Sequence, residues 1–208
     1  MKQFLIGMIT MLFCIGAFSG ECFKMTKKNM VSLTGAITDA SADAVIASFE
    51  KIKDNKESQF YLMIRSPGGE VKAGQKLVKY FRQFKNLNTV TVEAYSMAAY
   101  LVELLPGKRY ILSHGELMFH KVYFGYYQGP LTTEILEEFL TDLKIKNMFY
   151  AIQISSRLNM RIDTYLEILR FDWFLNAKEA IAHNAVDAII EFKLTKPLNT
   201  FLACEVSK

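Results

Sequence analysis

The chain has 208 residues, of which 51% are hydrophobic and 22% are charged, and its formal net charge is +4. A chain of this length and composition can bury one sizeable core, so we expect a single domain over residues 21–208. The small basic excess is spread along the sequence, which argues against nucleic-acid binding. The sequence has no CxxC, no HExxH and no clustered histidines, so it predicts no metal site and no cofactor.

Residues 1–20 have the pattern of a secretory signal peptide. Lys2 precedes an apolar run over residues 4–18, and Ala17 and Ser19 supply the small residues preferred before a cleavage site. This run is shorter than the roughly 20 residues that a membrane span needs. We therefore expect a periplasmic or secreted protein. Membrane anchoring by an uncleaved N-terminal segment is the first alternative, and a buried core helix is the second.

Two cysteines remain after the predicted signal peptide, Cys22 near the start of the mature chain and Cys204 near its end. In an exported protein such a pair suggests a disulfide that ties the termini together. Two unpaired thiols are the alternative, because the sequence does not give the distance between them.

Strands and helices alternate along the rest of the chain. The patterns predict strands at 30–37, 59–65 and 88–95, helices at 42–52, 71–84 and 97–105, and two short strands around a His-Gly turn at 114–115. A long helix from about 132 to 154 follows, and the last unit is a short helix that stops near Asn184 and then a strand. Strands that alternate with helices of this length indicate βαβ units and a parallel sheet, an α/β fold.

The long helix at 132–154 carries more apolar residues than a helix with one solvent-exposed face usually needs. Ile135, Phe139 and Leu143 recur at a spacing of four residues. Packing against a partner subunit is the interpretation that we favour, and a broad contact within one chain is the alternative.

Ser96 and the SPGG turn carry two of the parts that acyl transfer needs, a nucleophile and donors for an oxyanion. Ser96 lies where the strand at 88–95 gives way to a helix, so its oxygen would project from the end of the sheet with the Met97 amide beside it. A helix N-cap is the alternative role. The SPGG turn at 66–69 can bring an amide close to a bound carbonyl, or it is an ordinary strand-to-helix turn.

The scarcity of histidine restricts the choice of a base. His120 ends an apolar strand at the sheet edge where active sites of parallel α/β folds gather, which makes it the candidate, with a satisfied buried histidine as the alternative. His114 fits a surface turn. His183 fits the end of a helix, where the macrodipole favours a cation.

Asp172 is the candidate for the group that orients the base. It stands among Phe171, Trp173 and Phe174, and a carboxylate in apolar surroundings is costly to bury unless it is paired, for example with an imidazole N–H. A helix cap is the alternative for Asp172, although Asn176 is better placed for that role.

The order of these motifs resembles the Clp protease proteolytic subunit family. SPGG is followed by SMAA at the head of a helix, by PGKRY, by MFH, and by DWFLNAKEA with a Val-Asp pair after it; LTG at 33–35 and FYLMIRSPGG at 60–69 match the opening strands of the family. The resemblance covers about residues 30–190. It implies a crotonase-like α/β spiral of ββα units with a parallel sheet, and a long helix at 132–154 for oligomer contacts.

The resemblance also implies a serine peptidase mechanism. Its triad would be Ser96 as nucleophile, His120 as general base and then acid, and Asp172 as orienting carboxylate. The oxyanion amides would come from Gly69 and Met97, and the substrate would contact Gly68 and Lys121.

The chain departs from the family pattern in three places, the last of them a pair of residues. Val92 stands four residues before the serine, where the family has glycine, and Arg65 precedes SPGG in place of asparagine. Lys121 and Val122 follow the histidine in place of Gln-Pro. These changes bear on specificity and on activity toward long peptides. The N-terminal segment that meets an unfolding ATPase in the family is nearly absent.

We therefore expect an exported, ATP-independent serine endopeptidase that acts on peptides or unfolded proteins as a homo-oligomer. We expect no ATPase partner if it is exported, and a membrane contact only if the signal stays uncleaved. One alternative is a weakly active or inactive binding or assembly module, which Val92 and Arg65 favour. Another is a membrane-associated enzyme of the signal-peptide-peptidase type with a Ser-Lys pair, which His120 and Asp172 disfavour.

Overall fold

The structure, a computed structural model, describes residues 21–125, 128–194 and 200–206. Its centre is an eight-stranded sheet with the strand order β1-β8-β7-β5-β4-β3-β2, and β6 pairs with β5 outside that order. The strands are β1 (Cys22–Thr26), β2 (Met30–Thr34), β3 (Phe60–Ser66), β4 (Leu87–Tyr95), β5 (Arg109–Phe119), β6 (Trp173–Asn176), β7 (Ala188–Leu194) and β8 (Thr200–Glu205). The helices are α1 (Asp39–Glu50), α2 (Val71–Phe81), α3 (Met97–Leu104), α4 (Thr133–Arg157), α5 (Ile162–Ile168) and α6 (Ala177–Ala182). The predicted signal peptide lies outside the described residues.

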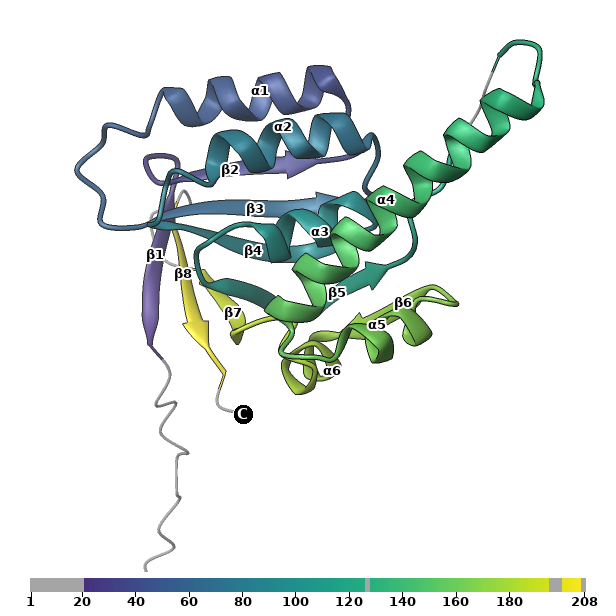
Figure 1. Cartoon of the computed structure of the whole chain (residues 1–208). Helices are drawn as coiled ribbons and strands as arrows, with labels where there is room; N and C mark the ends of the chain where they lie inside the picture. Colours follow the sequence, from purple (N-terminus) through teal and green to yellow (C-terminus); the bar gives the residue numbers. More distant parts are fainter. Residues whose placement is uncertain (1–20, 126–127, 195–199, 207–208) are drawn as a thin grey trace, which may run out of the picture.

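The middle of the sheet is parallel, as the sequence predicts. β2, β3, β4, β5 and β7 pair with one another in the parallel sense, and α1, α2 and α3 connect the first four of these strands in turn. Figure 1 shows the three helices on the same face of the sheet. This arrangement confirms the α/β fold. It also brings the carboxyl ends of β3, β4 and β5 to one edge, where ligand sites of such folds lie.

Helix α2 illustrates how the residue pattern produces the helical layer. Leu77, Val78 and Phe81, which the sequence places on one face, are buried, while Lys72 and Lys79 on the other face are exposed. Burial of each large apolar side chain contributes about 1.5–3 kcal/mol. This face therefore holds α2 against the sheet and fixes the turn that precedes it.

Two antiparallel strands, β8 and β1, extend the sheet beyond β7. Cys22 pairs directly with Cys204 in the β1–β8 ladder; their Cα atoms lie 4.1 Å apart and the two residues form a disulfide, which confirms the predicted pairing. A second apolar cluster is buried between these strands and the parallel part of the sheet: Met25, Tyr61, Val90, Tyr110, Leu112, Ile190 and Ala203. The sequence patterns indicate neither β1 nor β8, because such short strands gain their apolar contacts only through long-range pairing.

Strand β5 differs from the predicted elements. It is one strand where the sequence predicts two short strands around a turn at 114–115. Its pairing with β4 jumps from Thr91–Ile111 to Glu93–Glu116, so the chain stays extended while the ladder is interrupted. The strand therefore continues to the sheet edge at which β4 ends. Beyond α4 the structure also contains α5 and β6, which the sequence patterns do not predict.

Helix α4 is slightly longer than predicted, and its first half projects from the body of the molecule (Figure 1). Tyr150, Ala151 and Ile154 near its end are buried. Several apolar side chains spread along the helix are exposed: Leu136, Leu140, Ile145, Met148, Phe149 and Ile152. None of the helices in the described part of the chain combines the length and the apolar character that crossing a bilayer requires.

Candidate active site

A cavity of about 520 Å³ lies at the carboxyl ends of β3, β4 and β5. The turn after β3, the start of α3 and the segment after β5 form its walls. Five of the predicted site residues line it: Gly68, Gly69, Ser96, Met97 and His120. Asp172 and Lys121 are not among the lining residues. The fold thus brings the candidate nucleophile, base and oxyanion donors to one cavity.

Ser96 forms a sharp turn between β4 and α3. Its backbone angles, φ 56° and ψ −126°, lie in a region that residues other than glycine rarely adopt. The turn is held from both sides, because the Ser96 amide donates to the Met118 carbonyl at 2.8 Å and the Ser96 carbonyl accepts from the Tyr100 amide at 3.1 Å. Although Ser96 occupies the N-cap position, its side chain makes no capping hydrogen bond. The hydroxyl therefore does not serve as a helix cap, and Ser96 lines the cavity.

The SPGG turn packs directly against Ser96. Gly68 has φ +87°, and a Cβ atom there would lie 2.5 Å from the Tyr95 carbonyl oxygen and 2.7 Å from the Ser96 Cβ. Gly69 has φ +148°, and a Cβ atom there would lie 2.3 Å from the Ile37 carbonyl oxygen. Any side chain at either position would push the turn away from its neighbour. The two glycines are therefore required by close approach as well as by the backbone angle.

The amides of Gly69 and Met97 remain available as donors. Ile37 bonds to the backbone on both sides of Gly69, donating to the Gly68 carbonyl and accepting from the Glu70 amide, each at 2.8 Å. Within residues 21–125, 128–194 and 200–206, neither the Gly69 amide nor the Met97 amide donates a hydrogen bond. Both belong to residues that line the cavity beside Ser96, which is the requirement for an oxyanion site.

His120 follows β5 directly and is half-buried. Its Nδ1 atom lies 2.7 Å from the Lys121 carbonyl oxygen, and its ring packs against Tyr123 with the ring centroids 5.1 Å apart. A carbonyl oxygen can only accept, so Nδ1 carries the proton and donates, which leaves Nε2 unprotonated in the neutral ring. This is the tautomer that a general base at Nε2 requires.

Asp172 and His120 stand just beyond the end of the β5–β6 ladder. Phe119 pairs with Trp173 as the last pair of that ladder, and His120 follows Phe119 while Asp172 precedes Trp173. The Asp172 side chain is exposed, as are its neighbours Phe171 and Phe174. It makes no hydrogen bond or ion pair to any described residue.

His114, His183 and the cap residue Asn176 lie where the sequence predicts them. His114 and His183 are exposed, and His183 ends α6. Asn176 caps α6 through a reciprocal pair with Glu179, which confirms it as the better placed cap. Lys121 is also exposed and contributes its backbone carbonyl to His120.

The two departures upstream of the serine lie outside the cavity walls. Arg65 Nε is 3.3 Å from a carboxylate oxygen of Glu93, and both side chains are exposed. Val92 falls where the pairing of β4 with both neighbouring strands shifts register, and it packs against the second apolar cluster. Val122, in contrast, does line the cavity.

The sequence patterns miss Tyr100 as a site residue. It lines the cavity, stacks on Tyr150 with the ring centroids 4.8 Å apart, and donates its hydroxyl to the His120 carbonyl. Its position four residues after Ser96, one turn along α3, is the signal that could have indicated it.

A buried charge network holds the other end of α3. Arg109 contacts Glu103 and also Asp187, its Nη2 lying 2.6 Å from an Asp187 oxygen. Burial raises the pKa of Glu103 to about 7, against the opposing charge of Arg109. Burial also opposes ionisation of Asp187, but the hydrogen bonds from Arg109 prevail and lower its pKa. The network ties α3 to β5 and to the start of β7.

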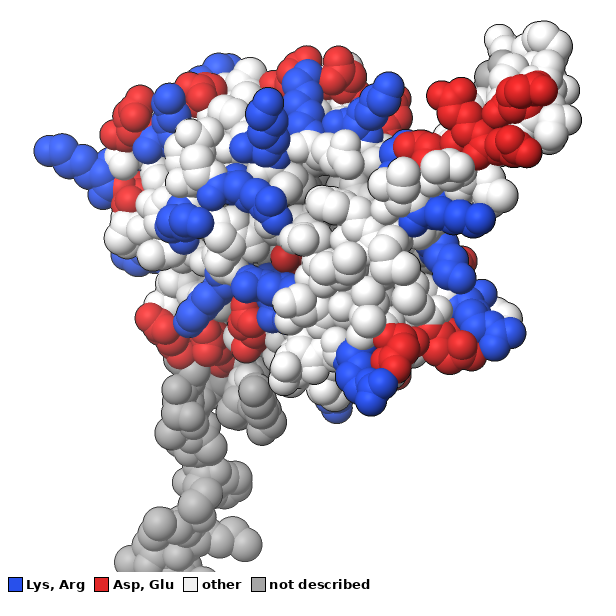
Figure 2. Space-filling view, viewed as in Figure 1, with Lys and Arg blue, Asp and Glu red and all other residues white. Residues whose placement is uncertain are grey.

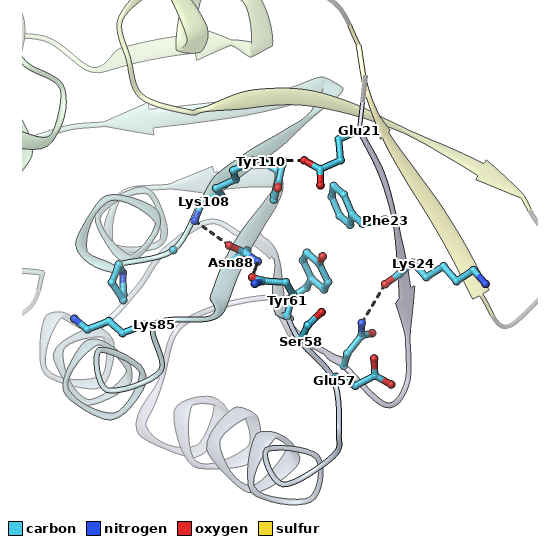
Figure 3. A pocket seen from close by; sticks show the side chains of 14 residues that line it. Glu21, Phe23, Lys24, Glu57, Ser58, Tyr61, Lys85, Asn88, Lys108 and Tyr110 are labelled. Carbon is cyan, nitrogen blue, oxygen red and sulfur yellow. Dashed lines mark hydrogen bonds and ion pairs between the residues drawn. The ribbon is translucent and has the colours of Figure 1, made fainter. Parts of the chain in front are cut away.

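A larger cavity, of about 680 Å³, lies at the opposite ends of the parallel strands (Figure 3). Phe23 stacks on Tyr61 in its wall with the ring centroids 4.9 Å apart, and burial raises the pKa of Tyr61 to about 12. Lys85 and Glu57 stand at its rim. Its described walls hold no histidine, so they offer no serine–histidine pair.

A family model described as Clp protease matches residues 20–193. The match covers most of the chain and includes every predicted catalytic residue, from Gly69 to Asp172.

Proposed function

The chain belongs to the Clp protease family, and from that premise we propose that it is a serine peptidase that cleaves peptide bonds through an acyl-enzyme formed on Ser96. Membership of this family supports peptidase activity in general. The finer assignment rests on the cavity that Ser96, His120 and the glycine turn share.

In this mechanism the Ser96 oxygen attacks the scissile carbonyl while His120 Nε2 takes the hydroxyl proton. The oxygen that becomes negative is held by the Gly69 and Met97 amides. The C–N bond then breaks, and His120 returns the proton to the departing amine. Water, activated by His120, hydrolyses the ester and restores Ser96.

The backbone of Ser96 is the observation that carries the proposal. A non-glycine residue at φ 56° and ψ −126° costs of order 1–3 kcal/mol. A plain helix cap needs no such strain, since an extended backbone serves it. The same conformation presents a side-chain oxygen at the end of a strand, as in the strand-turn-helix of other serine hydrolases.

Asp172 completes the triad in this account. It would replace the Lys121 carbonyl as the partner of His120 Nδ1 when the segment after β5 is drawn in by substrate or by a second subunit. The end of the β5–β6 ladder supports this role, since His120 and Asp172 are the next residues beyond its last pair, Phe119 with Trp173.

A second candidate is an inactive relative that binds peptides without cleaving them. The contact between His120 Nδ1 and the Lys121 carbonyl favours it, because a base satisfied by the backbone is not oriented by a carboxylate. A Ser-Lys enzyme is less well supported, since no lysine is among the described residues that line the cavity.

We further propose that the protein is exported and that its long helix binds a second copy of the chain. The Cys22–Cys204 disulfide supports an oxidising compartment, in which no ATP-driven unfoldase would assist. The exposed apolar side chains of α4 support self-association, and members of the family are typically oligomeric. Figure 2 shows acidic side chains over the projecting half of this helix, so two copies would need to bury apolar side chains while keeping these charges apart.

Hydrolysis of unstructured peptides tests the proposal. Purified protein is incubated with a mixture of short peptides, and the products are identified by mass spectrometry. We expect cleavage by the wild type and none by Ser96→Ala. Peptides that stay intact with both proteins, but bind both, would establish the inactive candidate instead.

A further inference from the structure

Glu70 places a negatively charged side chain in the wall of the candidate active site. It lines the same cavity as Ser96 and His120, and it is the one acidic residue among the described residues that do so. Neither a lysine nor an arginine lines the described part of this cavity. Apart from His120, the described lining of the cavity therefore contains one ionisable acid or base of the Asp, Glu, Lys and Arg types, and its charge is negative.

The Glu70 carboxylate is free to meet a ligand. Its side chain is exposed, and it does not cap α2 although Glu70 occupies the N-cap position of that helix. Among the residues that the structure describes, none donates a hydrogen bond to this carboxylate or forms an ion pair with it. The positive end of the α2 dipole favours a negative charge at this place.

The backbone holds Glu70 close to where a scissile bond would lie. Its amide donates to the Ile37 carbonyl at 2.8 Å, and the clash that a Cβ on Gly69 would make with that same carbonyl shows how little room the turn has to move. Gly69 is the proposed oxyanion donor. The carboxylate therefore leaves the chain one residue from the proposed oxyanion donor, in the wall of the same cavity.

We propose that Glu70 makes this site selective for peptides that carry a lysine or an arginine within a few residues of the scissile bond. This inference rests on the proposed peptidase function and adds the substrate class to it. An exposed ion pair of this kind gives a preference of about two- to fivefold in kcat/KM. Salt screens such a pair, so the preference should fall at high ionic strength.

A lysine scan of one peptide tests the inference. In a series of internally quenched peptides, one lysine or one glutamine occupies each position around a fixed cleavage site in turn. The ratio of kcat/KM for lysine over glutamine is measured at about 25 mM and about 500 mM salt. Glu57→Gln is the matched control, since it removes the same charge from the cavity at the other end of the sheet (Figure 3).

We expect the wild type and Glu57→Gln to prefer lysine at one or two positions at low salt, and Glu70→Gln to show a ratio near one. Equal rates for lysine and glutamine in the wild type, or a preference that survives in Glu70→Gln, would overturn the inference. The dissociation constants of the same peptides for Ser96→Ala, with and without Glu70→Gln, separate the two proposals. A lysine preference in binding that needs Glu70, without any cleavage by the wild type, would support the inference and reject the peptidase; equal binding would reject the inference.

Discussion

The hydroxyl of Tyr100 donates a hydrogen bond to the backbone carbonyl of His120. Tyr100 stands one turn after Ser96 on α3, so this bond joins the helix of the candidate nucleophile to the segment of the candidate base. The ring of Tyr100 is buried and stacks on Tyr150. Together with the bond from the Ser96 amide to the Met118 carbonyl, this contact holds the segments of Ser96 and His120 beside each other without involving either side chain.

Removing this hydroxyl should slow the reaction. In Tyr100→Phe the ring stays packed, but His120 loses the bond that fixes its backbone, and we expect kcat to fall about three- to tenfold with little change in KM. Tyr95→Phe is the control, because its hydroxyl bonds to Glu116 and does not line the cavity. Equal kcat values for Tyr100→Phe and the wild type would show that the contact does not position the base.

Substitution of Gly68 should destabilise the fold by more than backbone strain alone. Gly35 has a similar φ of +81° with nothing within 4 Å of the added Cβ, while Gly68 at +87° meets Tyr95 and Ser96. We expect Gly35→Ala to cost about 1–2 kcal/mol of the free energy of unfolding, and Gly68→Ala to cost a further 1–3 kcal/mol. Urea unfolding measures both. Equal losses would mean that the turn does not press on Ser96.

The disulfide should contribute strongly to stability. It joins residues 182 apart in sequence, and loss of a native disulfide typically costs 2–5 kcal/mol. Adding a reductant should lower the urea midpoint of the wild type to that of Cys22→Ala/Cys204→Ala, which itself should not respond to reductant. A wild-type midpoint that is insensitive to reductant would contradict the pairing.

Glu103 should make stability depend on pH. Its pKa is raised from 4.5 to about 7 in the folded state, so the folded state binds this proton more tightly than the unfolded state does. The resulting stabilisation is complete below about pH 4.5 and is lost as the pH rises through 7, by up to about 3 kcal/mol. Asp187 contributes to the pH dependence of stability with the opposite sign. Its contribution is lost at a lower pH than that of Glu103, because the pKa of Asp187 lies below its usual value of 3.8.

Urea unfolding of the wild type and of Glu103→Gln between pH 4.5 and about 8 checks this sign. The wild type should lose stability relative to the variant as the pH rises. A difference that stays constant, or that grows in favour of the wild type, would mean that Arg109 keeps the carboxylate ionised throughout.

The residues of the parallel layer could be placed from the sequence because each element carries its own periodic pattern. Leu77, Val78 and Phe81 on α2 are an example. The continuity of β5 could not, since the His-Gly pair is typical of a turn, and the strand is anchored only by long-range pairing before and after that pair, at residues 109–112 and 116–119. β1 and β8 likewise depend on contacts between the two ends of the chain.

The residue types of the candidate site could be predicted from the sequence, but the arrangement of those residues could not. The strand-to-helix junction indicates Ser96, yet its strained backbone follows from the bond to Met118 on a neighbouring strand. The approach of Asp172 to His120 likewise depends on long-range pairing, since the β5–β6 ladder ends one residue short of both, while His120 Nδ1 bonds to the adjacent Lys121 carbonyl. Tyr100 and Glu70 are site residues only because two segments close around the same cavity.

The most direct test of the serine peptidase is the position of a covalent adduct. The wild type is treated with a fluorophosphonate, and the modified residue is mapped by mass spectrometry after digestion. The account predicts one adduct per chain, on Ser96, that is absent in Ser96→Ala and forms at least a hundredfold more slowly in His120→Ala. A wild type that forms no adduct, or one that is modified at another residue, would contradict it.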